Sequence, residues 1–259
     1  MRRILVTGSK GQLGMSLKGL AHKYPSLVCV FRDSKTLDIT DVKAVNNIFD
    51  SNNFDYCINC AAYTNVEQAE KERDKAFAVN AEGVRNITYA CKKNQVVLLQ
   101  ISTDYVFDGE KETGYLPSDN PNPINVYGES KLKGEEIIQT GLTNYFIVRT
   151  SWLYNRNYGH NFYRTILSKA KAGEDLKVTA DQRGCPTNTD NLARFLLNLI
   201  VKNNKIYGIH HFSDGMAMTW YEFAKSILEE NGLKDRVKLE KAKNYRTFAA
   251  RPKNSVLIS

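Results

Sequence analysis

The chain has 259 residues, a length that suits one large domain or two unequal ones. Its 42% hydrophobic and 25% charged residues, the lack of any apolar run near the ~20 residues of a membrane helix, and the lack of a signal peptide exclude disordered, membrane and secreted proteins. The net charge of +8 raises the question of nucleic-acid binding, which depends on where the basic residues lie.

Strands and helices alternate through the first 150 residues. Short apolar runs predict strands at 2–7, 27–31, 56–62, 96–102 and 145–149. One helical pattern follows a glycine-rich turn and reaches residue 20, and others lie at 42–50, at 69–94 with at most one break, and at 126–139. Because the strands are apolar throughout and not alternating, we expect both faces of the sheet to be buried. This order predicts an α/β fold in which residues 1–150 form a Rossmann-type, doubly wound parallel sheet that binds a dinucleotide.

The pattern is looser in the second half. Helices are predicted at 162–172, 191–201 and 220–231, with irregular segments between them. No Gly/Ser linker or internal repeat separates the two halves. We therefore expect residues 151–259 to form mainly a smaller substrate-binding lobe, with a helix near 188–202 that packs back on the Rossmann domain.

Three glycines, Gly8, Gly11 and Gly14, lie between the first predicted strand and the first helix. There they allow a tight turn, close approach of a pyrophosphate, and free N–H groups at the helix start. A three-glycine pattern alone is a weak signal. At the first βα turn of a doubly wound fold it indicates a dinucleotide site.

Tyr127 and Lys131 are four residues apart and therefore share one face of a predicted helix. A nearby ammonium lowers the pKa of a phenol from about 10, so Tyr127 can donate a proton to a carbonyl oxygen as hydride reaches its carbon. An ordinary surface pair would have the same spacing. Thr103 favours the catalytic interpretation, because it ends the fourth predicted strand, where open α/β sheets bind ligands.

The basic residues are concentrated near the C-terminus. Between 234 and 253, eight Lys and Arg residues oppose Asp235 and Glu240, so this window carries +6 of the +8. Such a cluster suits a phosphate-bearing small ligand as well as nucleic acid, and a solvated surface explains it equally well. Only Tyr245 and Phe248 supply stacking aromatics, so we expect no nucleic-acid partner.

The five cysteines are an odd number scattered along the chain, which predicts reduced thiols and a cytoplasmic location. Cys57 and Cys60 lie within the predicted strand 56–62, which would direct their side chains to opposite faces. No second Cys or His pair completes a zinc set, so we expect no metal site.

Longer segments carry a resemblance to a known family: VTGSKGQLG, LDITD, INCAAYTNVEQAE, STDYVFDG, NPINVYGESKLKGE, VRTSWLY, DQRGCPTN and RPKNSVL. The chain resembles the extended short-chain dehydrogenase/reductase family, and within it the dTDP-4-dehydrorhamnose reductases. The resemblance implies a dTDP-sugar substrate. It also implies NAD(P)H-dependent reduction of the C4 carbonyl of dTDP-4-dehydro-6-deoxy-L-mannose to dTDP-L-rhamnose.

The resemblance also implies roles for individual residues. Tyr127 would donate the proton, Lys131 would bind the nicotinamide ribose and lower the pKa of Tyr127, and Thr103 would hold the substrate carbonyl. Trp152 would contact the sugar nucleotide, although a place in the core or at a lobe interface would explain it too. The further substrate contacts would be Asp104 and Arg251. The further cofactor contacts would be Gly8, Gly11, Gln12, Leu13, Gly14, Asp38, Ile39, Ala61, Ala62, Tyr63 and Thr64.

The end of the second predicted strand bears on the choice of cofactor. Arg32 could pair with a 2′-phosphate, which favours NADPH, whereas Asp33 could accept from a ribose hydroxyl, which favours NADH. We favour NADPH, with NADH also usable.

Two alternatives stay open at this point. A related nucleotide-sugar reductase or epimerase would have the same catalytic residues. A non-catalytic regulatory subunit, like the beta subunit of methionine adenosyltransferase, would resemble the family too, although the intact Thr103, Tyr127 and Lys131 argue for an enzyme. Met15 stands where some relatives have a Glu that takes part in a magnesium-linked dimer, so we expect a monomer or homodimer. The family pattern also continues beyond RPKNS into a further helix, so we expect a longer natural chain or an incomplete lobe.

Overall fold

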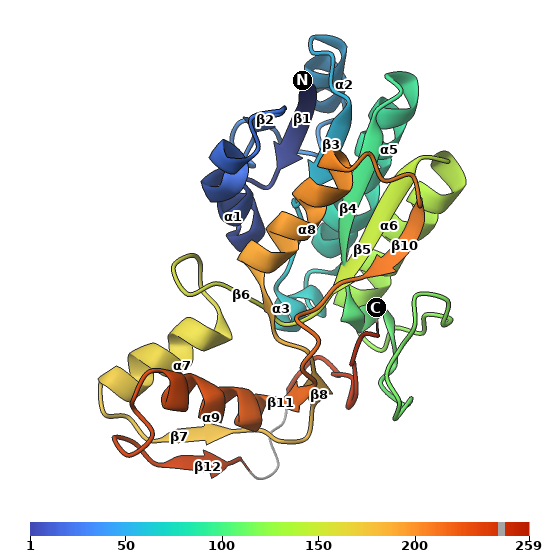
Figure 1. Ribbon diagram of the computed structural model, residues 1–259. Helices are drawn as coiled ribbons and strands as arrows, with labels where there is room; N and C mark the ends of the chain where they lie inside the picture. The colour runs from blue at the N-terminus through green and yellow to red at the C-terminus, as the bar shows by residue number, and fades with distance from the viewer. Residues whose placement is uncertain (243–246, 259) are drawn as a thin grey trace.

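In the computed structural model, which describes residues 1–242 and 247–258, six strands form one central sheet (Figure 1). The strand order is β10-β5-β4-β3-β1-β2, and every neighbouring pair is parallel. The α/β fold expected from the sequence is confirmed. The strands are β1 (Arg2–Thr7), β2 (Leu27–Phe31), β3 (Tyr56–Asn59), β4 (Val97–Thr103), β5 (Tyr145–Thr150) and β10 (Gly208–His211).

The sheet reverses its winding direction between β1 and β3, the place where open α/β sheets bind ligands at the carboxyl ends of their strands. β3 ends three residues earlier than the predicted strand 56–62, so residues 60–64 are free to form a loop at this edge. β10 comes from the second half of the chain and pairs with β5.

Helices cover both faces of the sheet, because neighbouring strand residues point to opposite sides. Ile4 and Val6 of β1 pack in one cluster with α1 (Gln12–Leu20) and α8 (Thr189–Val201). Leu5 packs in the other cluster with α2 (Val42–Asp50), α5 (Gly83–Lys93) and α6 (Val126–Gly141). Although α8 follows Thr150 by some forty residues, it thus shares a core with β1 and α1.

The segment predicted as helical over 69–94 with at most one break is divided at residues 70–72, and its second part includes a π-helical turn. It contains α3 (Val66–Ala69), α4 (Arg73–Phe77), the π-helical turn η2 (Ala78–Glu82) and then α5. The side chain of Asn80 in η2 holds the loop after β3, since it accepts from the Tyr63 N–H at 2.9 Å and donates to the Tyr63 carbonyl at 3.0 Å. The π-helical turn therefore positions a loop at the ligand-binding edge.

The rest of the second half has a separate hydrophobic cluster, formed mainly by α7 and α9, which lie beside β7 and β12 below the main sheet in Figure 1. Two further short strand pairs are β6 with β9 and β8 with β11, and the second pair lies beside α9 in Figure 1. The bounds are β6 (Leu153–Tyr154), α7 (Phe162–Lys171), β7 (Leu176–Val178), β8 (Arg183–Gly184), β9 (Thr187–Asn188), β11 (Met218–Thr219), α9 (Trp220–Glu230) and β12 (Leu239–Lys241), with 3₁₀ turns η1 (Ala21–Lys23) and η3 (Asp104–Val106).

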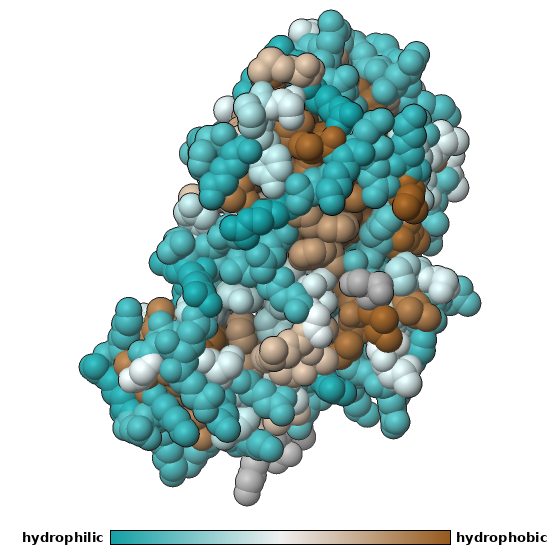
Figure 2. Space-filling view, viewed as in Figure 1, coloured by the Kyte–Doolittle hydropathy of each residue, from teal (hydrophilic) through white to brown (hydrophobic). Residues whose placement is uncertain are grey.

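The surface seen in Figure 2 is mostly hydrophilic, with hydrophobic residues gathered beside the C-terminal end of the chain. Within residues 1–242 and 247–258, none of the helices combines the length and the apolar character needed to cross a membrane.

Candidate active site

Two glycines of the glycine-rich turn, Gly8 and Gly14, lie where a side chain would not fit. Gly8 has φ +62°, and a Cβ there would lie 2.6 Å from the backbone of Cys60 and Ala61. A Cβ on Gly14 would lie 2.5 Å from the Gly8 carbonyl oxygen. No side chain caps the start of α1, which leaves this helix end open to an anionic ligand.

A cavity of about 710 Å³ runs from this turn along the carboxyl ends of β1, β3 and β4. Its volume falls in the range of small-molecule and cofactor sites. Every residue expected at the cofactor except Arg32 lines it: Gly8, Gly11, Gln12, Leu13, Gly14, Asp38, Ile39, Ala61, Ala62, Tyr63, Thr64, Tyr127 and Lys131.

Arg32 lies outside the cavity, and its guanidinium donates to its own neighbour, the Phe31 carbonyl, at 3.1 Å. Lys10, Asp33 and Ser34 line the cavity instead. Lys10 forms an ion pair with Asp33, and this contact, together with hydrogen bonds from Thr36, holds the pKa of Asp33 well below its usual range. Lys10 lies within the glycine motif, so its position in the sequence was a usable signal that the sequence analysis missed.

Residues from the second half also line the cavity, and nothing local in the sequence indicated them. Gly159 and His160 lie opposite the glycine turn. A Cβ on Gly159, which has φ +68°, would lie 2.5 Å from the Gln12 side chain. Asn161 donates to Gln12 Oε1 at 2.8 Å, so this segment is held against the start of α1.

Tyr127 reaches the other end of the cavity because α6 packs very closely on its neighbours. Asn125 caps α6 by accepting from the Gly128 N–H at 2.7 Å. A Cβ on Gly128 would lie 2.1 Å from the Tyr105 carbonyl oxygen, and one on Gly134 would lie 2.3 Å from the Asn80 carbonyl oxygen. Glycine at both positions therefore brings the helix, and Tyr127 with it, against η3 and η2.

Burial raises the pKa of Tyr127 well above 10, and the nearby Asp104 raises it further, whereas the Thr103 hydroxyl acts in the opposite direction. This differs from the expectation that Lys131 lowers the Tyr127 pKa. Lys131 is itself buried and donates to the Ile101 carbonyl at 2.7 Å, and burial lowers its pKa to about 8. The Tyr127 phenol therefore stays protonated at neutral pH, the form that a proton donor needs.

Three of the four residues expected at the substrate lie in one region, and Trp152 lies elsewhere. Thr103 and Asp104 are buried beside Tyr127, at the end of β4. Arg251 reaches the same region from the C-terminal segment, where it pairs with Glu67 at 2.7 Å and donates to the Tyr105 hydroxyl at 3.3 Å. The Tyr105 ring packs edge-on against Tyr127, with 5.9 Å between the ring centroids.

Trp152 is half-buried, and its indole packs closely on two neighbours. One face stacks on Trp220 of α9 at 3.6 Å between centroids. On Gly184 a Cβ would lie 2.6 Å from the Trp152 ring. Trp152 also has φ +46°, a conformation that a bulky residue adopts only when its surroundings impose it. Stacking on Trp220 therefore leaves at most the other face and the edges of this indole for a sugar, and the sequence analysis missed Trp220 as its packing partner.

The basic cluster contributes little to the site. Lys243 and Arg246, as well as Tyr245, lie outside the described residues. Lys234 and Lys238 pair with nearby glutamates, Arg236 donates to the Lys171 carbonyl, and Lys241 lies over the Tyr221 ring. Arg251 lies next to Tyr105, which packs on Tyr127. Across the parts of the chain that the structure describes, no three His, Cys, Asp or Glu side chains come together as a metal site.

Comparison with known proteins gives consistent matches. The family model described as RmlD substrate binding domain matches residues 1–259. The dTDP-4-dehydrorhamnose reductase of Aggregatibacter actinomycetemcomitans is 40% identical, over 99% of this chain and 90% of its own length. The crystal structure of dTDP-4-dehydrorhamnose reductase from Bacillus anthracis in complex with NADP is 40% identical, with a TM-score of 0.93 over 100% of this chain and 91% of that chain. The dTDP-4-keto-6-deoxy-D-glucose reductase of Streptomyces niveus is 36% identical, over 86% of this chain and 76% of its own length.

Proposed function

The chain belongs to the family of the RmlD substrate binding domain, and from this premise we propose that it reduces the C4 carbonyl of dTDP-4-dehydro-6-deoxy-L-mannose with NADPH, giving dTDP-L-rhamnose. One structural observation carries the proposal. A cavity of dinucleotide size begins at the glycine turn and ends at Tyr127 and Lys131, with the Thr103 hydroxyl beside the phenol. The names of the relatives supply the substrate class.

The residues of the cavity fit a nicotinamide dinucleotide. The cofactor supplies the hydride when it is bound. The glycine turn and the start of α1 receive the diphosphate, and Lys131 orients the ribose next to the nicotinamide. Tyr127 gives its proton to the carbonyl oxygen, and the Thr103 hydroxyl donates a hydrogen bond to the same oxygen. Arg251 attracts the diphosphate of the sugar nucleotide.

The cofactor choice depends on Lys10 in this proposal, because its ammonium is the cation that lines the cavity near Ser34 and Asp38. We expect Lys10→Ala to raise the KM for NADPH about tenfold, as the loss of one charged hydrogen bond implies, and to leave the KM for NADH nearly unchanged. Steady-state kinetics with both cofactors measure this. Arg32→Ala is the matched control, since the Arg32 guanidinium donates to the Phe31 carbonyl and does not line the cavity. A loss of NADPH preference in Arg32→Ala and not in Lys10→Ala would contradict the assignment.

One observation favours a second candidate substrate. A relative whose sequence identity to this chain is 36% is named a dTDP-4-keto-6-deoxy-D-glucose reductase. NADPH oxidation, followed at about 340 nm, distinguishes the candidates when both dTDP-4-ketosugars are supplied separately. We expect faster turnover with dTDP-4-dehydro-6-deoxy-L-mannose and dTDP-L-rhamnose as the product by NMR. Tight NADPH binding without turnover of either sugar would favour the regulatory subunit instead.

Three further expectations belong to the same proposal. The division at about residue 150 into a cofactor domain and a substrate lobe is supported by the separate hydrophobic cluster of α7 and α9. A cytoplasmic location is supported by the five cysteines, which are all free. The assembly is a monomer or homodimer, and light scattering measures it.

A further inference from the structure

A buried group of hydrogen bonds lies directly behind Tyr127, between the end of β4 and the C-terminal segment 249–258. The Thr103 hydroxyl donates to Asp104 Oδ1 at 3.2 Å, and the Ser255 hydroxyl donates to Asp104 Oδ2. The backbone N–H of Tyr105 donates to Thr103 Oγ1 at 3.2 Å. Asp104 is 3% exposed and Ser255 is 2% exposed, so bulk water does not compete for these bonds.

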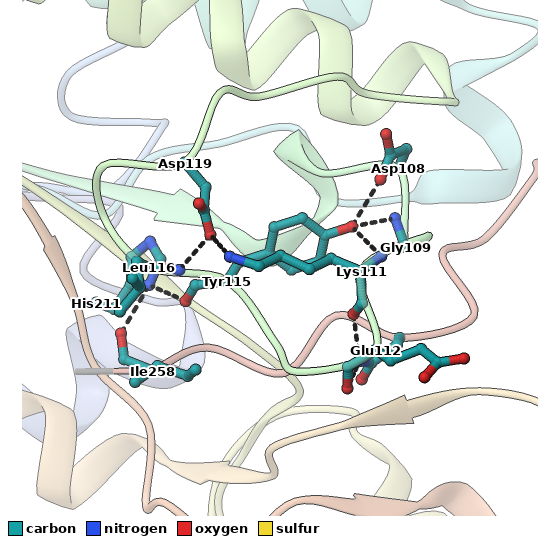
Figure 3. A network of polar contacts seen from close by, with 10 residues as sticks. Asp108, Gly109, Lys111, Glu112, Tyr115, Leu116, Asp119, His211 and Ile258 are labelled. Atoms are coloured by element: carbon teal, nitrogen blue, oxygen red, sulfur yellow. Dashed lines mark hydrogen bonds and ion pairs between the residues drawn. The ribbon is translucent and has the colours of Figure 1, made fainter.

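The segment that carries Ser255 is held firmly from both sides. The Ser255 N–H donates to the Arg183 carbonyl at 2.8 Å. The neighbouring Asn254 side chain donates to the Lys111 and Glu112 carbonyls at 2.7 and 2.9 Å. Figure 3 shows the loop that contains these two carbonyls, in which the Tyr115 hydroxyl bonds to Asp108, Gly109 and Lys111. Ser255 is therefore a fixed donor to Asp104.

The number of protons on Thr103 limits what its hydroxyl can do. A hydroxyl has one proton and two lone pairs, and the Tyr105 N–H already occupies one lone pair. When Asp104 is ionised, its carboxylate accepts the hydrogen bond that the Thr103 hydroxyl donates, so this hydroxyl has no proton left to donate to a substrate. When Asp104 is a neutral acid, its O–H donates to the second lone pair of Thr103, and the Thr103 proton is free to point at the carbonyl oxygen.

We propose that Asp104 is a positioning residue which, as the neutral acid, turns the Thr103 hydroxyl proton toward the carbonyl oxygen of the substrate. This inference rests on the proposed function and changes the role expected for Asp104. Both carboxyl oxygens are bonded inside the protein, so Asp104 acts on the sugar through Thr103.

The surroundings of Asp104 keep its neutral form accessible. Burial raises its pKa to about 7, although the bonds from Ser255 and Thr103 oppose this rise. The titratable groups around it are Tyr105 of η3, Tyr127 of α6 and Cys185, and burial raises the pKa of each of them, so they stay neutral. Arg251, a cation in the same region, is bonded to Tyr105 and compensated by Glu67.

The sign of the pH dependence follows from the raised pKa. The neutral acid predominates below about pH 7, so kcat/KM is expected to fall about tenfold between pH 6 and pH 8. Asp104→Asn should remove this fall, since its amide N–H donates to Thr103 at every pH. Ser255→Ala should move the midpoint of the fall to higher pH, because it removes a bond that lowers the Asp104 pKa.

The experiment compares kcat/KM from about pH 5.5 to about pH 9 in the wild type and three variants. Asp108→Asn is the matched control. The Asp108 carboxylate also accepts a hydrogen bond from a side-chain hydroxyl, that of Tyr115. The pKa of Asp108 is lowered and not raised, so Asp108 does not titrate near pH 7 and the control should keep the wild-type profile. A separate fall near pH 8, where Lys131 titrates, should persist in all four proteins. An unchanged fall near pH 7 in Asp104→Asn, or a midpoint that does not rise in Ser255→Ala, would overturn the proposal.

Infrared spectroscopy separates this inference from the proposed function, because it needs no turnover. The wild type should show the carbonyl stretch of a buried carboxylic acid that disappears as pH rises through about 7, and Asp104→Asn should lack it. If that band is present and no dTDP-4-ketosugar is reduced, the proposed function fails and the neutral Asp104 stands. If the band is absent from the wild type, the inference is wrong whatever the activity.

Discussion

Tyr127→Phe is expected to lower kcat by about 10²–10⁴-fold and to leave NADPH binding nearly intact. The variant removes the hydroxyl at the end of the cavity and keeps the ring that packs edge-on against Tyr105. Burial keeps the phenol protonated, so its proton is available when hydride reaches the carbonyl carbon. Stopped-flow or steady-state oxidation of NADPH with the dTDP-4-ketosugar measures the loss, and fluorescence titration measures cofactor binding.

Tyr63→Phe is the matched control for this prediction. Tyr63 lines the same cavity, but its hydroxyl donates to Glu72 at 2.8 Å and not to the reacting end. We expect its kcat to stay within a few-fold of the wild type. Equal losses in both variants would indicate damage to the cavity as a whole and would refute Tyr127 as the specific proton donor.

Glu135→Gln is expected to lower the free energy of unfolding by about 3–5 kcal/mol, because it leaves the charge of Arg149 buried without its partner. Glu135 of α6 and Arg149 of β5 are each 1% exposed and joined at 2.7 Å. The Ser102 hydroxyl donates to the same carboxylate, and the guanidinium lies 5.0 Å from the Phe107 ring. Urea unfolding followed by circular dichroism measures the change.

The next residue on the same helix supplies the control. Glu136 pairs with Lys133 at 2.9 Å, but both side chains are about half exposed, so Glu136→Gln should cost less than about 1 kcal/mol. Replacing Glu135 and Arg149 together by apolar residues should recover much of the lost stability. A loss in Glu135→Gln as small as in Glu136→Gln would show that the buried pair contributes little.

Much of the fold was predictable from local patterns. β1, β2 and α2 lie at their predicted bounds, and β4 and β5 lie within one residue of theirs, because strands buried on both faces are apolar throughout and helices repeat their apolar face. The prediction of a helical segment over 69–94 with at most one break agrees with the break at 70–72, but it missed the π-helical turn at 78–82. That turn is stabilised by contacts of Asn80 with Tyr63 and Ser130, which no pattern within the segment indicates.

The glycine turn, Tyr127 and Lys131 were recognised because their chemistry depends on short spacings: a glycine at every third position of a βα turn and one helical turn between a phenol and an ammonium. Such spacings are properties of the chain. The contacts made by Arg251 and Ser255 are not, since each lies about 150 residues from the group that it touches near Tyr127.

Protonation and packing around the site depend on the folded structure for the same reason. Motif spacing suggested a Tyr127 pKa lowered by Lys131, yet burial in the folded protein raises it. Trp152 stacks on Trp220 and lies close to Gly184, and Lys10 lines the cavity where the sequence suggested Arg32. Local order is encoded in neighbouring residues, whereas desolvation and contact partners arise only when segments distant in the chain are packed together.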